Sequence, residues 1–494
     1  MNSSWIKSLL VTMPLSAVLT LSGCGSSPTA PSVSPPSSPP STAESSVVAM
    51  PAAATILPGQ SQQFVAQVSG LSDKTVTWQV EGSGGGTITS TGLYTAPSAT
   101  GVYTVIATSS AGANYSAAAL VLVTAKPSPF SPTGNLVYGR EFHTATLLAD
   151  GTVLVAGGGE YEAYCTAGSD FAELYDPVSG SFALTSSMTD RRYAQTSTLL
   201  QNGKVLITGG FSFDKSACFN AGTSPPLISA ELYDPSSGSF APTGSMSEAR
   251  GLHTATLLST GKVLIVGGGN GGGGRPPFAG DGSATAEVYD PATGTFTPTA
   301  SMSTARIGHT ATLLLDGKVL VAGGITSGSS GSLVTHTFPL ATAELYDPVT
   351  GTFTVVATMT VPRAGHTATL LRDGNVLISG GFTDSTLGAA GVGTGTAEIY
   401  DPAKATFLPT NKPMVLGRWA HTATLLPDGT VLLVGGGSSV AETYSPPDGS
   451  FSAIGLDESD RLGHTATLLK NGSVVIIGGF DYGKGPLTTA ELYR

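Results

Sequence analysis

One stretch decides the fold: Arg140-Glu-Phe-His143-Thr-Ala-Thr-Leu-Leu-Ala-Asp-Gly-Thr-Val-Leu-Val-Ala-Gly-Gly158, the first of seven copies in a chain of 494 residues. The seven copies open at Arg140, Arg192, Arg250, Arg306, Arg363, Arg418 and Arg461. A second phrase, Ala172-Glu-Leu-Tyr-Asp-Pro177, follows the first copy and recurs after the others. Because self-similarity at a period of about 43–58 residues is the signature of a repeat architecture, the fold follows from the repeat rather than from any single residue.

Each copy predicts four short antiparallel strands. In the first copy the expected strands are 143–148, 153–156, 172–175 and 182–188. An Asp-Gly turn joins the first pair and an Asp-Pro turn joins the last pair. Four antiparallel strands make one blade of a propeller. The double glycine, the Glu-x-Tyr strand and the Phe/Met outer strand resemble a Kelch repeat. This resemblance implies an all-β fold with a seven-bladed β-propeller of four-stranded antiparallel blades over residues 127–494.

The last copy lacks a fourth strand, because the chain ends at Glu491-Leu-Tyr-Arg494. The missing strand is expected just ahead of the first copy. There, Phe130 to Leu136 aligns residue for residue with Phe296 to Met302. We therefore expect residues 130–136 to close the last blade and leave no open sheet edge.

The amino terminus has the features of a targeting segment. Residues 1–23 are expected to form a signal peptide, with Lys7 ahead of an apolar run that is too short to span a membrane. Leu21-Ser22-Gly23-Cys24 resembles a bacterial lipobox, which implies lipidation of Cys24. The alternative is an ordinary signal peptide. Residues 24–45 are rich in Ser and Pro, as expected of an extended tether.

Residues 46–125 carry short strands separated by turns, which suggests a β-sandwich. The phrases Pro58-Gly59-Gln60 and Gly92-Leu-Tyr94-Thr-Ala-Pro97 resemble a bacterial Ig-like domain of group 2. Trp78 and Tyr94 are then expected in its core, and the domain is expected to act as a spacer.

The net charge excludes some partners. The chain has 22 Lys and Arg against 33 Asp and Glu, a formal charge of −11, and it has no basic cluster. Nucleic acid and anionic membrane surfaces are therefore poor candidates. We expect a monomer that contacts the membrane through its lipid anchor only. The expected location is the bacterial cell envelope, at the outer membrane or cell surface.

Charged residues recur at fixed positions of the repeat. Each arginine is matched by one glutamate: Glu173, Glu231, Glu287, Glu344, Glu398, Glu442 and Glu491. Because charged residues are scarce in this chain, their recurrence at the same positions of each repeat predicts a repeated, partly buried ion pair. The alternative is an anion-binding ring of arginines around the axis.

Six histidines follow the arginines by three residues: His143, His253, His309, His366, His421 and His464. Gln195 replaces the histidine in the second copy. Metal ligands must converge to about 2 Å from one ion, whereas residues of different blades lie much farther apart. We expect each imidazole to bond backbone within its own blade, with no metal and no cofactor bound.

Function is expected where the repeats differ, which is between the second and third strands. These insertions span about 160–171, 211–229, 270–285, 325–342 and 382–396, with short ones at 438–440 and 480–489. The candidate binding residues on this loop face are Tyr161, Tyr164, Phe213, Phe278, Asp281, His336, Phe338, Phe382 and Tyr482. Aromatic side chains beside carboxylates suit a sugar or a protein partner, although loop aromatics can also pack the loops down.

The remaining two cysteines, Cys165 and Cys218, fall in neighbouring insertions of this face. In an exported protein such a pair indicates a possible disulfide, and two free thiols are the alternative.

These observations favour a non-enzymatic, lipid-anchored binding or adhesion protein with a carbohydrate or protein ligand. The alternative is an exported carbohydrate-active enzyme, epimerase- or hydrolase-like, in which Glu160, Asp214, Asp281 and Asp481 converge near the axis. Kelch-type propellers also include copper radical oxidases, which hold copper through two histidines and tyrosines. Only His336 lies outside the repeat, so the sequence argues against that chemistry.

Overall fold

The computed structural model describes residues 45–112, 114–124, 128–162, 165–212, 225–269, 282–327, 337–383, 393–457 and 459–494. Within these ranges every regular element is a β-strand, so the fold is all-β as expected. No helix in this part of the chain is long and apolar enough to cross a membrane.

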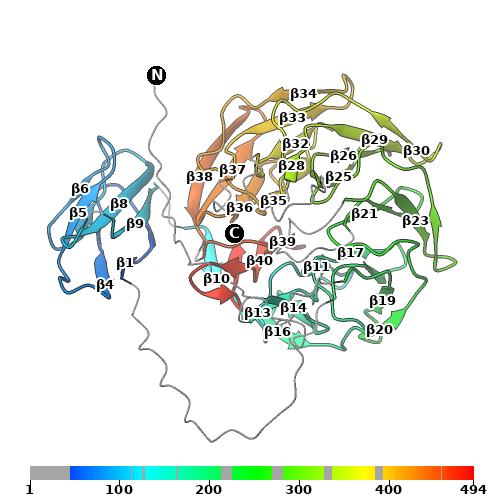
Figure 1. Ribbon diagram of the computed structural model, residues 1–494, viewed down its shortest axis with the longest axis horizontal. Helices are drawn as coiled ribbons and strands as arrows, with labels where there is room; N and C mark the ends of the chain where they lie inside the picture. The colour runs from blue at the N-terminus through cyan, green and yellow to red at the C-terminus, as the bar shows by residue number, and fades with distance from the viewer. Residues whose placement is uncertain are drawn as a thin grey trace, which may run out of the picture.

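Residues 45–124 form an Ig-like β-sandwich (Figure 1). One layer has the strand order β2-β9-β8-β5, and the other contains the pair β1-β4 and the sheet β3-β7-β6. The strands are β1 (Ser46–Met50), β2 (Ala53–Ile56), β3 (Ser61–Gln63), β4 (Val65–Ser69), β5 (Val76–Val80), β6 (Thr87–Ile88), β7 (Leu93–Thr95), β8 (Gly101–Ser109) and β9 (Ser116–Val123). Tyr94 is fully buried in the core, and its hydroxyl donates to the Gly85 carbonyl at 2.6 Å. Trp78 packs against the same core, as expected for both side chains.

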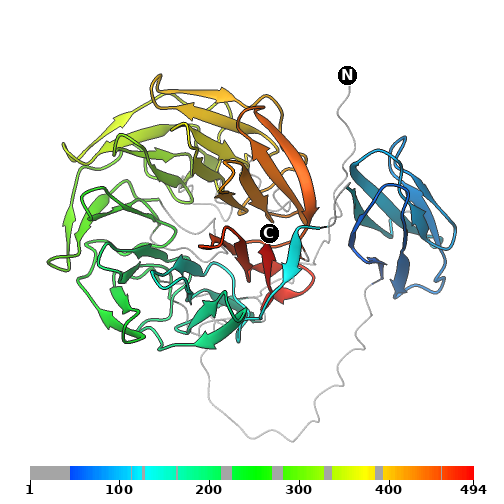
Figure 2. The ribbon, with the colours of Figure 1, turned by 180° about the vertical axis from the view of Figure 1, so that it is seen from behind.

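The rest of the described chain forms seven four-stranded antiparallel sheets arranged around an axis (Figures 1 and 2). The first three sheets contain β11 (Thr144–Leu147), β12 (Val153–Ala156), β15 (Ala172–Asp176) and β16 (Ser181–Leu184); β17 (Thr196–Leu199), β18 (Val205–Thr208), β19 (Ala230–Asp234) and β20 (Ser239–Pro242); and β21 (Thr254–Leu257), β22 (Val263–Val266), β23 (Ala286–Asp290) and β24 (Thr295–Pro298). The next three contain β25 (Thr310–Leu313), β26 (Val319–Ala322), β29 (Ala343–Asp347) and β30 (Thr352–Val355); β31 (Thr367–Leu370), β32 (Val376–Ser379), β33 (Ala397–Asp401) and β34 (Thr406–Pro409); and β35 (Thr422–Leu425), β36 (Val431–Val434), β37 (Val440–Ser445) and β38 (Ser450–Leu456).

The seventh sheet joins the two ends of the propeller. It contains β39 (Thr465–Leu468), β40 (Val474–Ile477), β43 (Ala490–Tyr493) and β10 (Phe130–Pro132). β10 pairs antiparallel with β43, with Phe130 opposite Tyr493 and Pro132 opposite Glu491. Figure 2 shows this strand beside the last sheet. The innermost strands also close a ring, because each contacts the next and β39 returns to β11.

Three two-stranded ribbons accompany the loops of this ring. They are β13 (Gly159–Glu162) with β14 (Cys165–Gly168), β27 (Ile325–Ser327) with β28 (Thr337–Pro339), and β41 (Phe480–Asp481) with β42 (Gly485–Pro486).

The propeller core lies between neighbouring sheets. The second strand of each propeller sheet consists of four residues with small or apolar side chains. All four are buried, because each sheet is covered on both faces. Leu154 of the first propeller sheet, for example, belongs to the same cluster as Ile207 and Tyr233 of the second. Each such aliphatic side chain contributes about 1.5–3 kcal/mol on full burial. A tyrosine of the third strand meets a phenylalanine of the fourth, as in Tyr175 and Phe182, whose ring centroids lie 4.8 Å apart.

The two domains touch through the outer face of the Ig-like sheet. Alternate residues of β9 point into the sandwich core, whereas Leu122 points away from it and is still only 1% exposed. Leu122 lines a cavity of about 650 Å³ together with Val415 and Ile454 of the propeller. The propeller therefore covers part of this sheet.

Candidate binding face around the propeller axis

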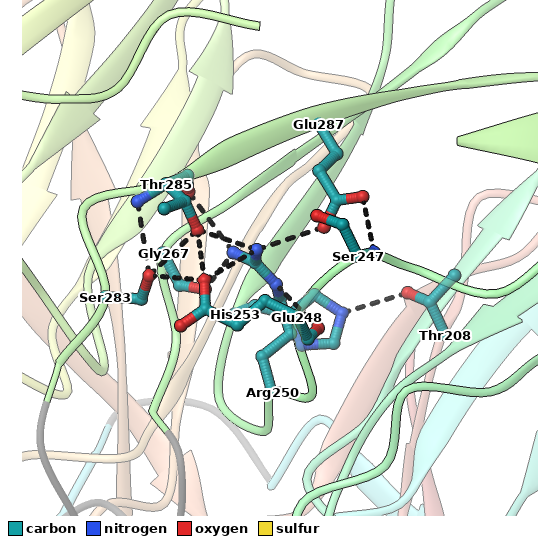
Figure 3. Close-up of polar contacts among 9 residues, drawn as sticks. All are labelled: Thr208, Ser247, Glu248, Arg250, His253, Gly267, Ser283, Thr285 and Glu287. Atoms are coloured by element: carbon teal, nitrogen blue, oxygen red, sulfur yellow. Dashed lines mark hydrogen bonds and ion pairs between the residues drawn. The ribbon is translucent and has the colours of Figure 1, made fainter. Parts of the chain in front are cut away.

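The seven arginines are fully buried and paired within their blades. Each guanidinium meets the glutamate of the third strand, at N–O distances from 2.5 to 3.1 Å. Arg250 also donates to the Gly267 carbonyl at 2.7 Å and to the Thr285 hydroxyl at 2.8 Å (Figure 3). Because none of the seven side chains reaches the surface, an anion-binding ring of arginines is not formed.

Six of these glutamates also hold the chain as it enters a blade. The second carboxylate oxygen of Glu287 accepts the Ser247 backbone N–H at 2.8 Å (Figure 3). Glu173, Glu231, Glu344, Glu398 and Glu442 accept the backbone N–H of Val137, Thr189, Ser303, Thr360 and Val415 in the same way. The ion pair therefore fixes the segment that crosses from one blade to the next.

The histidines link neighbouring blades, a contact that the sequence did not predict. His309 Nε2 lies 3.0 Å from Thr254 Oγ1 on the first strand of the preceding blade. His143, His253, His366, His421 and His464 meet Thr465, Thr196, Thr310, Thr367 and Thr422 at 2.9–3.1 Å. The ring reaches across because glycine leaves room for it: a Cβ on Gly267 would lie 2.7 Å from His309 Cε1.

These imidazoles are held neutral. Burial, followed by the charge of Arg306, lowers the pKa of His309 to about 3. Burial lowers the pKa of His464 to about 4. Among the residues that the structure describes, no three His, Cys, Asp or Glu side chains gather as a metal site would require.

A belt of left-handed residues surrounds the axis. The residue before each histidine position has a φ between 49° and 61°. The belt consists of Phe142, Ala194, Leu252, Gly308, Gly365, Ala420 and Gly463. Backbone N–H groups of this belt donate to the carbonyl of the preceding member, at 2.8 Å from Phe142 to Gly463 and at 3.0 Å from Leu252 to Ala194. The belt lies at the loop-face end of the axis, where each first strand begins.

A cavity of about 260 Å³ opens at this belt. Its lining residues are Phe142, His143, Ala194, Gln195, Leu252, His253, Gly308, His309, Gly463 and His464. Phe142 and Leu252 are the large apolar members, and the imidazoles and the Gln195 amide supply the polar edges. We call this space the axial cavity.

Apolar side chains extend the same face away from the axis. In six of the seven copies the residue after the arginine forms a bridge with the residue after the double glycine, as in Tyr193 with Phe211 and Leu462 with Phe480. Tyr482 is 64% exposed and meets Phe480 edge-on, with ring centroids 5.6 Å apart. Among the described residues, the loop face therefore has an apolar floor with one strongly exposed aromatic ring, Tyr482.

Two of the candidate binding residues can be placed with their side chains. Tyr482 is exposed on the face, as expected. Phe382 is only 3% exposed, which corrects its assignment as a contact residue. It packs with Ile307, Ile325 and Ala364 and meets Trp419 edge-on at 6.2 Å, so that it forms the floor of the face.

The other candidates are not tested. Tyr161 lies on β13 and Phe338 on β28, with side chains outside the described part. The remaining candidates, Tyr164, Phe213, Phe278, Asp281 and His336, lie outside the described residues, as do Cys24, Cys218 and the Cys165 side chain. The lipid anchor and the disulfide stay predictions.

Three residues of the face were missed from the sequence: Phe142, Leu252 and Trp419. They occupy the two positions between the arginine and the histidine position. These two positions vary from copy to copy, whereas the rest of the phrase differs little. The signal was therefore present, as variation inside a constant phrase rather than in the insertions.

The last blade carries an additional buried carboxylate. Asp457 Oδ1 lies 2.9 Å from Arg461 Nε, while Glu491 Oε1 lies 2.5 Å from the Nη2 of the same guanidinium. Burial and the neighbouring Asp457 raise the pKa of Glu491 to about 8. Burial, Asp481 and Asp457 raise the pKa of Asp460 to about 6.

Comparisons with known proteins support both domains. Residues 45–119 match the model of the bacterial Ig-like domain (group 2), and residues 251–303 and 307–360 match the Kelch motif. No curated protein matches the chain. A solved structure described as a novel fungal alcohol oxidase with catalytic diversity among the AA5 family, in complex with copper, aligns with a TM-score of 0.58 and 18% identity, over 75% of this chain and 76% of that one. At this identity the likeness establishes the fold alone.

Proposed function

We propose that this protein is a non-enzymatic, lipid-anchored binding or adhesion protein of the bacterial cell envelope, with a carbohydrate or protein ligand on the loop face of its propeller. The observation that carries the proposal is the apolar surface around the axis. Phe142, Leu252 and Trp419 lie there half-buried, and Tyr482 is exposed. Aromatic anchors set in a concave surface are typical of binding sites for small molecules and protein partners.

The repeat itself supports a scaffold role. Its arginines, glutamates and histidines are engaged within and between blades, and their side chains are buried. What differs from blade to blade lies on one face, as in other repeat proteins that present a binding surface.

The test is a binding screen of the full-length protein against glycans and envelope extracts, with Tyr482→Ala as the principal variant. The matched control is Leu315→Ala, which removes a side chain that is 74% exposed beside the Asp316-Gly317 turn on the opposite face. We expect weaker binding for the first variant and no change for the second. Equal binding by wild type and Tyr482→Ala would argue against the loop face.

The second candidate function is an exported carbohydrate-active enzyme, and Asp460 is the observation that favours it. A carboxyl with a pKa of about 6 is suited to general acid–base catalysis near neutral pH. Its Oδ1 is buried and has no hydrogen-bond partner among the described residues. Turnover of a glycan that disappears in Asp460→Asn, with ligand binding retained, would promote this candidate over the first.

A further inference from the structure

Bulky side chains occupy strained positions at the axis. Left-handed φ values suit glycine, and three members of the belt are glycine. Phe142 and Leu252 adopt the same conformation at φ 51° and 55°, which large side chains disfavour. The other five repeats have Gly or Ala at this position of the belt, so the propeller fold does not require the side chains of Phe142 and Leu252. Both line the axial cavity.

Gln195 lines the same cavity and carries an unsatisfied acceptor. Its Nε2 donates to the Ala156 carbonyl at 2.8 Å, which fixes the orientation of the amide. The residue is only 6% exposed, and its Oε1 is buried and accepts no hydrogen bond from the described residues. A buried acceptor of this kind calls for a donor from a bound molecule or water.

The cavity also has no formal charge. The four histidines in its lining are neutral because burial lowers the pKa of each. The nearest arginines are directed into their ion pairs with glutamate. A charged ligand would therefore find no counter-ion among the lining residues and would lose its hydration.

We propose that the axial cavity seats one neutral pyranose unit, with a sugar hydroxyl donating to Gln195 Oε1 and the apolar face of the ring lying on Phe142 and Leu252. The volume of about 260 Å³ is smaller than the pockets that hold drug-sized molecules, and it suits a single sugar ring. A hydrocarbon would leave Gln195 unsatisfied, and a sugar acid would bury its charge. This inference rests on the proposed function and specifies its ligand.

The experiment titrates the full-length protein with neutral methyl pyranosides of glucose, galactose and mannose, followed by saturation-transfer NMR and calorimetry. Methyl glucuronide is the charged comparison. Gln195→His introduces the residue of the other six repeats, so it retains a side chain that can link the blades and removes the amide acceptor. Phe142→Gly introduces the belt residue of three other repeats and removes the aromatic wall.

The control is Ala405→Gly. Ala405 also has a left-handed φ, 51°, but it lies in the turn between β33 and β34 and not in the axial cavity. All three variants are expected to melt within a few degrees of wild type, so that a loss of affinity reports the site rather than unfolding.

We expect saturable, weak binding of at least one neutral pyranoside, about tenfold weaker in Gln195→His and in Phe142→Gly, and unchanged in Ala405→Gly. Methyl glucuronide binding as tightly as the neutral sugars would overturn the inference, as would equal affinities in all variants. If no pyranoside binds but the binding of larger glycans or envelope proteins still depends on Tyr482, the axial site is refuted and the proposed function is retained. If nothing binds, both fall.

Discussion

The same substitution, Glu→Gln, should have opposite effects in two equivalent blades. Glu344 pairs with Arg306 at 2.8 Å, and both side chains are buried. Glu344→Gln retains the hydrogen-bonding shape but leaves the arginine charge buried without a counter-charge. Breaking such a pair costs about 3 kcal/mol. Because the entropy of unfolding scales with chain length, this loss of stability corresponds to a fall in Tm of roughly 4 °C for a propeller of this size.

Glu491 differs because Asp457 already neutralises Arg461. Two carboxylates share one guanidinium, and the site retains a proton: the pKa of Glu491 rises from 4.5 to about 8. The folded state therefore binds more protons than the unfolded state between these pH values. This contribution to stability is fully present below pH 4.5 and is lost as the pH rises through about 8.

The magnitude follows from the pKa of Glu491. From pH 5.5 to about 8 the folded state loses roughly 1.36 kcal/mol per pH unit, or about 3 kcal/mol. Glu491→Gln removes this dependence, because the amide does not titrate. We expect the variant to match wild type near pH 4.5 and to exceed its stability at pH 8.5.

Thermal unfolding followed by circular dichroism at both pH values measures the two variants side by side. Glu344→Gln should melt lower than wild type at both pH values. A Glu491→Gln variant that is destabilised at pH 8.5 as strongly as Glu344→Gln would show that the two carboxylates do not share a proton and would refute the reasoning.

Three further predictions concern the scaffold. Gly267→Ala should destabilise the protein strongly, because Gly267 has a φ of 62° and a Cβ would lie 2.8 Å from the Arg306 carbonyl oxygen; Ala405→Gly is the control in chemical unfolding. His309→Gln should be tolerated, since Gln195 links blades in the second repeat, whereas His309→Ala should lose about 1 kcal/mol; equal melting temperatures would disprove the link. Deleting residues 130–136 should lower the melting temperature of the propeller sharply, because β43 loses its outer neighbour; an unchanged melting curve would contradict closure by β10.

Much of the fold could be predicted because the repeat carries it. The alternation of strands and turns is local, and seven copies average out the ambiguity of any one. The Arg–Glu pairs could also be predicted from the sequence, since charged residues are rare in this chain and these recur at the same position of each repeat. The histidine contacts were not, because whether a ring turns to its own blade or to the preceding one depends on the left-handed residue before it and on a glycine from another sheet.

The binding face shows the same division. Tyr482 is exposed, whereas Phe382, which looked the same in the chain, is buried. Burial depends on neighbours such as Ile307, Ile325 and Trp419, which come from other blades. No local pattern distinguishes an aromatic residue that lies in the floor from one that lies on the surface.

The sequence by itself determined the repeat, the strand order within each blade, the ion pair and the Ig-like domain, because these depend on residues close in the chain or on their fixed period. Only the tertiary structure decided what lies at the axis. There, residues from seven repeats meet, and a position that is structurally equivalent in every copy holds glycine in one blade and Phe142 or Leu252 in another. Closing the ring brings these differences together in one cavity, and that convergence cannot be read from any single repeat.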